Sequence, residues 1–158
     1  MDAIITDISQ FLMQWGVLGV FIAAFLAGTV IPFSSELILV AIVKMGAEPV
    51  SCVIAASFGN TLGGMTCYYI GHLGKIEWVK KYFGVKQEKL DRVMKFMQGK
   101  GSYMALFTFV PFLGETMSIV LGLMRSNVYV TSAAMFVGKM TRYIVILFVS
   151  LKAIEFVR

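Results

Sequence analysis

Histidine, cysteine and proline are scarce in this chain of 158 residues, which contains one histidine, two cysteines and three prolines. One histidine and two cysteines do not form a Cys/His cluster with the spacing of a zinc site. Cys52 and Cys67 fall in one predicted helix, where a separation of about 22 Å is too long for a disulfide. No G-x-S-x-G, H-E-x-x-H or P-loop motif is present. We therefore expect neither an enzyme nor a protein that needs a cofactor.

Charge is also scarce. Charged residues make up 15% of the chain and hydrophobic residues 58%. A soluble domain of this length does not need so much apolar surface. We therefore expect a single domain over residues 1–158, an all-α polytopic protein integral to a membrane.

The few charges are unevenly distributed. Residues 75–100 contain eight basic and three acidic residues, a net charge of +5, and the rest of the chain is neutral. Basic segments between membrane spans mark cytoplasmic loops. We expect residues 75–101 to form a basic, amphipathic cytoplasmic connector of one or two helices, broken at Gly84. Its charge suits contact with anionic headgroups and not nucleic acid.

One short motif occurs twice in apolar sequence. Pro-Phe-x-x-Glu runs from Pro32 to Glu36 and again, 79 positions later, from Pro111 to Glu115. A helix-breaking proline followed by a carboxylate, at equivalent places in two halves, is typical of a binding site at a repeat interface. The alternative is chance similarity between two hydrophobic segments.

The apolar segments around each motif follow the same order. An apolar segment ends at the proline, a short arm too short to span a bilayer follows, and a full-length span comes last. The pattern predicts two inverted structural repeats, each a Pro-broken re-entrant hairpin followed by a transmembrane helix. The halves are residues 8–74, with segments 8–31, 37–45 and 50–70, and residues 87–152, with segments 103–110, 116–124 and 128–151. Residues 46–49 are expected to form a turn, and Arg125 to close the second short arm.

Small residues recur in the long spans. Gly59 and Gly63 form a GxxxG pattern, and Gly138 takes the place of Gly59 in the second half. Such residues let helix backbones approach closely in lipid. Asn60, inside the pattern, can act either as a packing residue or as part of a binding site. Aromatic and polar residues at the end of the first long span predict a membrane interface there: Tyr68, Tyr69, His72 and Trp78.

Four ionisable residues fall at positions predicted to lie in the membrane: Glu36, Glu115, Lys139 and Arg142. Charges there are costly and usually face a bundle interior or an aqueous cavity. Each carboxylate begins the second arm of a broken helix, where backbone amides and the helix dipole favour negative charge. The alternative is a structural ion-pair cluster that only holds helices together.

These motifs together resemble one family of membrane proteins. Residues 15–150 are similar to the DedA family, also called VTT-domain or SNARE-associated proteins. The resemblance is carried by Pro32-Phe33-Ser34-Ser35-Glu36, Gly59-Asn60-Thr61-Leu62-Gly63-Gly64 and Pro111-Phe112-Leu113-Gly114-Glu115. Similarity to the YqaA-like branch is carried by Gly122-Leu123-Met124-Arg125 and Gly138-Lys139-Met140-Thr141-Arg142-Tyr143.

The resemblance implies oppositely oriented re-entrant hairpins and a location in a bacterial inner membrane. It also implies a role in lipid-carrier translocation and membrane homeostasis, often linked to protons. Glu36 matches the acidic residue of the family's first hairpin, and Pro111 the proline of the second. Many members have Phe-x-Arg-Phe-x-Pro-x-x-Arg around the second hairpin. Here the arginine positions are Thr108 and Gly114. Whether Lys139 and Arg142 take the cationic role is left open.

We expect a transporter or flippase-like protein. Glu36 and Glu115 would exchange protons, while Lys139 and Arg142 would attract an anionic headgroup. The expected partners are membrane lipids, including a phosphate-headgroup lipid carrier, and protons; formation of a homo-oligomer is left open. The first alternative is a non-transporting, membrane-organising or assembly protein. The second is an intramembrane lipid-phosphate hydrolase, for which no histidine or serine nucleophile can be placed.

Overall fold

The computed structural model describes residues 2–29, 34–74, 76–84, 86–99, 101–110 and 113–157. Every regular element in this part of the chain is helical, as predicted. In chain order the elements are α1 (Asp2–Gly28), α2 (Ser35–Lys44), α3 (Pro49–His72), α4 (Ile76–Phe83), α5 (Gln87–Met97), the 3-10 helix η1 (Gly101–Phe109), α6 (Gly114–Leu123) and α7 (Val128–Val157).

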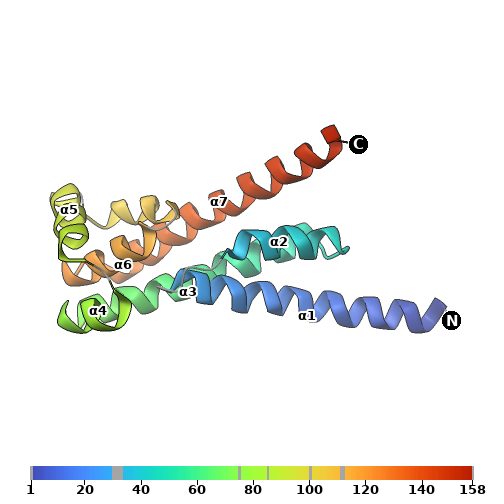
Figure 1. The fold of residues 1–158 in the computed structure, drawn as a ribbon, viewed down its shortest axis with the longest axis horizontal. Helices are drawn as coiled ribbons and strands as arrows, with labels where there is room; N and C mark the ends of the chain where they lie inside the picture. Colours follow the sequence, from blue (N-terminus) through green and yellow to red (C-terminus); the bar gives the residue numbers. More distant parts are fainter. Residues whose placement is uncertain are drawn as a thin grey trace.

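The long helices α3 and α7 form the centre of the molecule and run in opposite directions (Figure 1). α1 packs along α3, and α2 folds back beside α1. At the other end of the molecule, η1 packs on α7, and α6 folds back between η1 and α3. α2 and α6 therefore lie toward opposite ends of the long helices.

Within the described residues, two helices are long and apolar enough to cross a membrane, α3 and α7. They correspond to the predicted spans 50–70 and 128–151, and α7 continues six residues further, to Val157. Pro49, predicted to lie in a turn, is instead the first residue of α3. The first helical turn needs no amide donor from its first residue, so proline fits there. α1 begins before the predicted residue 8, and its apolar part is Trp15–Gly28.

The two short helices repeat each other in local structure. α2 and α6 each contain ten residues, and their bounds differ by the same 79 positions as the motif. Both end in a Schellman motif, in which two amides beyond the helix bond back to its last turn. The bonds are Ala47 N to Ile42 O at 3.2 Å and Gly46 N to Val43 O at 3.1 Å, and Ser126 N to Leu121 O at 3.1 Å and Arg125 N to Gly122 O at 3.0 Å.

Glycine brings the helices into backbone contact, as predicted. A Cβ at Gly59 would clash with the carbonyl of Phe21, and one at Gly63 would lie 2.9 Å from the Cα of Gly28. These contacts join α3 to α1. Gly138 has the same role in the second half, where a Cβ would clash with the carbonyl of Leu106 in η1.

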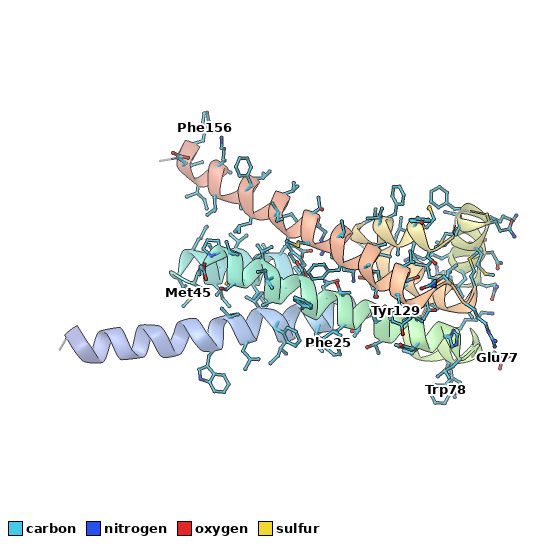
Figure 2. The ribbon with its side chains drawn as sticks, turned by 180° about the vertical axis from the view of Figure 1, so that it is seen from behind. Phe25, Met45, Glu77, Trp78, Tyr129 and Phe156 are labelled. Carbon is cyan, nitrogen blue, oxygen red and sulfur yellow. The ribbon has the colours of Figure 1, made fainter. Side chains whose placement is uncertain are left out.

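The basic connector forms two helices, α4 and α5, separated at Gly84, which has φ +61°. α5 does not turn its apolar side outward: Leu90, Val93 and Met97 are buried in a cluster shared with α6. Its basic side remains at the surface. Figure 2 shows that Trp78 of α4 and Met45, just after α2, lie at opposite ends of the molecule.

Tyr68 was predicted to lie at the membrane interface with Tyr69, His72 and Trp78, but the structure places it in the core. Its side chain is fully buried, and its hydroxyl donates a hydrogen bond to the carbonyl of Ser126, whereas Tyr69, His72 and Trp78 are exposed. Tyr68 therefore belongs to the core between α3 and α6. A buried tyrosine is stable there because its hydroxyl has an acceptor.

Candidate functional site

Asn60 and Lys139 meet at the centre of the long helices. Lys139 on α7 is 3% exposed and donates hydrogen bonds to both oxygens of Asn60 on α3: to the backbone carbonyl at 2.8 Å and to the side-chain Oδ1. A side chain at Gly64 would displace the ammonium group, because its Cβ would lie 2.9 Å from Nζ. The two residues are 79 positions apart, which is the offset of the repeated motif. Equivalent positions of the two halves therefore contact each other directly.

Tyr143 connects this centre to α2. Its hydroxyl accepts a hydrogen bond from Nδ2 of Asn60 at 2.8 Å and lies 2.8 Å from the hydroxyl of Ser35. All three side chains are buried. The backbone oxygen and Oδ1 of Asn60 both accept hydrogen bonds from Lys139, and its Nδ2 donates one to Tyr143. These bonds determine the orientation of the Asn60 side-chain amide. Three helices, α2, α3 and α7, thus share one buried polar network.

Glu36 forms an ion pair with Arg142 beside this network. The two side chains are 23% and 14% exposed, so the pair is largely removed from solvent. Glu36 is the second residue of α2, and Arg142 lies one turn along α7 from Lys139. A pair in such surroundings resists loss of either partner, because the remaining charge would be left without compensation.

Glu115 does not join the same cluster. It lies in the first turn of α6, equivalent to Glu36 in α2, but within the described residues no basic group lies close enough to form an ion pair with it. Lys139 still acts on Glu115 electrostatically. The four predicted charges therefore separate into a Glu36–Arg142 pair, an Asn60-bound Lys139 and a distinct Glu115. In the described part of the chain, no group of three His, Cys, Asp or Glu residues could hold a metal ion.

A pocket of about 370 Å³ lies between η1 and α7, and Arg142 is part of its wall. We refer to it as the η1–α7 pocket. The hydroxyl of Thr141, which also lines it, donates to the carbonyl of Val137 at 2.8 Å and so has its own partner. The other lining residues are apolar or glycine: Leu106, Val137, Gly138, Val145 and Ile146. The surface of the pocket is thus almost entirely apolar.

The remaining predicted residues have structural positions. Gly59, Gly63 and Gly138 lie at helix contacts, and Arg125 takes a left-handed conformation with φ +51° at the end of α6. Pro32 and Pro111 lie outside the described residues.

Ser35, Gly64 and Tyr143 were not predicted as members of the site. Tyr143 is four residues from Lys139, so helical spacing from the charged positions would have pointed to it. Ser35 is next to Glu36, but the period of α2 gives no reason to turn it toward α7.

The chain is similar to several known proteins, some of which are named as membrane proteins. An uncharacterized protein of Haemophilus influenzae is 32% identical over 82% of this chain and 84% of its own length. The inner membrane protein YqaA of Escherichia coli is 28% identical over 80% of this chain and 84% of its own length. The uncharacterized membrane protein YkoX of Bacillus subtilis is 31% identical over 63% of this chain and 47% of its own length. No family model and no solved structure matches the chain. The predicted relation to YqaA is confirmed by this similarity.

Proposed function

This chain belongs to the same protein family as the H. influenzae relative, and we propose that it is a DedA-type transporter or flippase-like protein, linked to protons and acting in membrane homeostasis. It is an integral protein of the inner membrane, consistent with the names of its relatives and its two long apolar helices. DedA membership is supported by the motifs that carry the resemblance and by the similarity to YqaA.

The proposal includes an architecture of two inverted repeats, each with a re-entrant hairpin. α2 and α6 are offset by the same number of positions as the first residues of α3 and α7. α3 and α7 also run in opposite directions (Figure 1). Both observations support this architecture. With the basic connector in the cytoplasm, α3 runs inward and the η1–α6 hairpin returns to the cytoplasmic face. With Cys52 and Cys67 replaced by alanine, the single cysteine of a Gly84→Cys or Ser126→Cys variant should then react with an impermeant reagent from the cytoplasm. Reaction from opposite faces would contradict the hairpin.

The main support for transport is the position of the Glu36–Arg142 pair. An ion pair in the membrane part of a protein is costly, so its placement beside an apolar pocket favours a role in moving charged ligands. In the proposed mechanism an anionic headgroup interacts with Arg142, and Glu36 exchanges protons as the ligand arrives and leaves. The phosphate-headgroup lipid carrier expected from the family resemblance has the matching charge.

Flux measurements test this function. The protein is reconstituted in liposomes with a pH gradient, and translocation of a fluorescent polyprenyl-phosphate lipid is followed. Glu36→Gln should reduce the pH-driven rate at least about tenfold, equal to a barrier increase of about 1.4 kcal/mol. Glu88→Gln, on the exposed side of α5, is the matched control and should transport normally. Wild-type liposomes without flux above empty liposomes would reject the proposal.

A membrane-organising role is the second candidate. It is favoured by the internal pairing of the charges: Lys139 with Asn60 and Arg142 with Glu36. Proton uptake separates the two functions. Adding the phosphate lipid to the purified protein should cause proton uptake in the wild type and less in Glu36→Gln and Glu115→Gln. No uptake in the wild type would favour the structural role.

A further inference from the structure

The ammonium group of Lys139 lies between three helices. It belongs to α7 and donates hydrogen bonds to both oxygens of Asn60 on α3. It is also close to α6, because a Cβ at Gly64 would lie 2.9 Å from Nζ of Lys139 and 3.6 Å from Oγ of Ser118. An ammonium group has three hydrogen-bond donors, and Asn60 accepts from two of them. Lys139 is therefore bound to α3 while it remains next to α6.

A difference between the two halves makes room for this ammonium group. Tyr143 and Gly64 are 79 positions apart, as Lys139 and Asn60 are, so they occupy equivalent places. The hydroxyl of Tyr143 reaches Ser35 in the first turn of α2. Gly64 has no side chain, and the ammonium group of Lys139 takes the space that a side chain there would need. In the second half, the group that extends toward the short helix is therefore a cation and not a phenol.

Glu115 lacks the cation that its counterpart has. Glu36 pairs with Arg142, but the residue equivalent to Arg142 in the first half is Gly63, which has no side chain. Lys139 is a buried cation that acts on Glu115 electrostatically. A carboxylate largely removed from water is strongly unfavourable without a compensating charge. Lys139 is placed to supply that charge.

Several helices contribute titratable groups around Glu115. The groups that act on it electrostatically are Lys139 and Tyr143 of α7, Lys89 of α5 and Cys67 of α3. η1, which also packs on α6, has Tyr103 as its one titratable residue, and that side chain is 72% exposed. Of the two cations, Lys89 is at the surface side of α5 and only partly buried, whereas Lys139 is buried. A change in the charge of Glu115 therefore affects Lys139 most directly.

We propose that the ammonium group of Lys139 exchanges between Asn60 and Glu115, and that loss of the Glu115 proton moves it away from Asn60. This inference rests on the proposed function, to which it adds a proton-linked step outside the Glu36–Arg142 pair. With Glu115 protonated, Lys139 stays on Asn60 and joins α3 to α7. With Glu115 ionised, the attraction between opposite charges in a site removed from water outweighs two hydrogen bonds to neutral oxygens. The contact between α3 and α7 is then released. The flexible four-carbon stem of lysine allows this exchange without movement of α6.

Isotope labelling of asparagine tests the proposal, because the chain contains two asparagines, Asn60 and Asn127. The labelled protein is placed in nanodiscs of neutral lipid, and NMR follows both side-chain amides from about pH 5 to about pH 9, a range that includes perturbed carboxyl groups. Asn60 loses its hydrogen bonds from Lys139 in the exchange, so its signal should move in one pH transition. Asn127 is the internal control, because its Oδ1 accepts hydrogen bonds from the amides of Tyr129 and Val130 at the start of α7. Its signal should stay in place, and it shows that each sample is folded.

Three variants identify the groups that cause the transition. Glu115→Gln cannot ionise, so Lys139 should stay on Asn60 and the Asn60 signal should keep its acid position at every pH. Lys139→Met removes the ammonium group and should also abolish the transition. Glu36→Gln is the matched control, because it removes the equivalent carboxylate of the first half and should retain the transition.

Three outcomes would overturn the proposal: a wild-type Asn60 signal without a pH transition, a transition that persists in Glu115→Gln or Lys139→Met, or a transition that is lost in Glu36→Gln. The measurement uses no transported lipid and does not depend on flux. A transition in a protein without flux would reject the proposed function and retain the exchange at Lys139. Flux by a protein whose Asn60 signal does not respond to pH would reject the exchange and retain the function.

Discussion

α2 and α6 are equivalent in sequence position and alike in length and in the Schellman motif that ends them, yet they are held in different ways. Eight of the ten residues of α6 are buried, but only two of the ten in α2. α6 contacts α3 through backbone at glycines, whereas the first turn of α2 contacts α7 through polar and charged side chains. Close apolar packing fixes a helix in one position, because it has few alternative arrangements. Side-chain pairs can exchange partners. The same local unit can thus serve as a fixed support in one half and as an adjustable element in the other.

The largest expected effect comes from a side chain placed at the tightest α6 contact. Gly122 and Val43 are equivalent positions, and a Cβ at Gly122 would clash with the carbonyl of Tyr68. Gly122→Leu should reduce stability by about 3 kcal/mol or more, and Val43→Leu by about 1 kcal/mol or less. Thermal unfolding and the yield of monodisperse protein in detergent measure both. Equal losses of stability in the two variants would contradict the conclusion that α6 is packed more tightly than α2.

A smaller effect is expected from the two motif carboxylates. Glu36→Gln should weaken the contact of α2 with α7 by about 1.5 to 3 kcal/mol, because Arg142 loses a charged hydrogen-bond acceptor. Glu115→Gln removes no ion pair seen in the described residues and should have little effect. Hydrogen exchange of amides in residues 38–44 and 117–123 reports each helix separately. Faster exchange in α6 after Glu115→Gln would show that its charge also holds the helix.

The smallest effect concerns the residues that end the two helices. Gly46 and Arg125 are equivalent, and both have positive φ, +106° and +51°. A side chain is strained in the left-handed region, so Arg125→Gly should stabilise the protein by about 1 kcal/mol. Gly46→Ala should destabilise it by a similar amount. Unfolding midpoints measured in the same detergent compare the two variants. Destabilisation by Arg125→Gly would mean that a contact of the Arg125 side chain stabilises the protein by more than its backbone strain costs.

Much of the fold could be predicted from local signals. Hydrophobic length predicted the long helices, and small-residue spacing predicted a close backbone contact of α3 without identifying α1 as its partner. The repeated motif predicted two short arms in equivalent places, residues 37–45 and 116–124, close to α2 and α6. The rotation and translation of helices could not be predicted, and they determine which charges meet. Tyr68 illustrates this: aromatic residues near a helix end suit an interface, but the approach of α6 buries it.

Which residues pair within the site also depends on the rotation and translation of the helices, which could not be predicted. Lys139 and Arg142 are three residues apart on α7, so the sequence predicts that they share a face. The structure places them beside different partners, because α3 packs against one turn of α7 and the first turn of α2 against the next. Gly64 belongs to one of the motifs that carry the resemblance, but nothing in the sequence indicates that it lies against a lysine. Its role appears only once the lysine lies against it.

The contact between Asn60 and Lys139 limits how far the two halves can be interchanged. If the halves are inverted repeats, a residue that touches its own counterpart lies on the axis that relates them. Two copies of the first half would then place two asparagines together, and their amides can bond to each other. Two copies of the second half would place two ammonium groups together in a buried site, where like charges repel strongly. A homodimer built from the first half alone is therefore electrostatically permitted at this point, and one built from the second half is not.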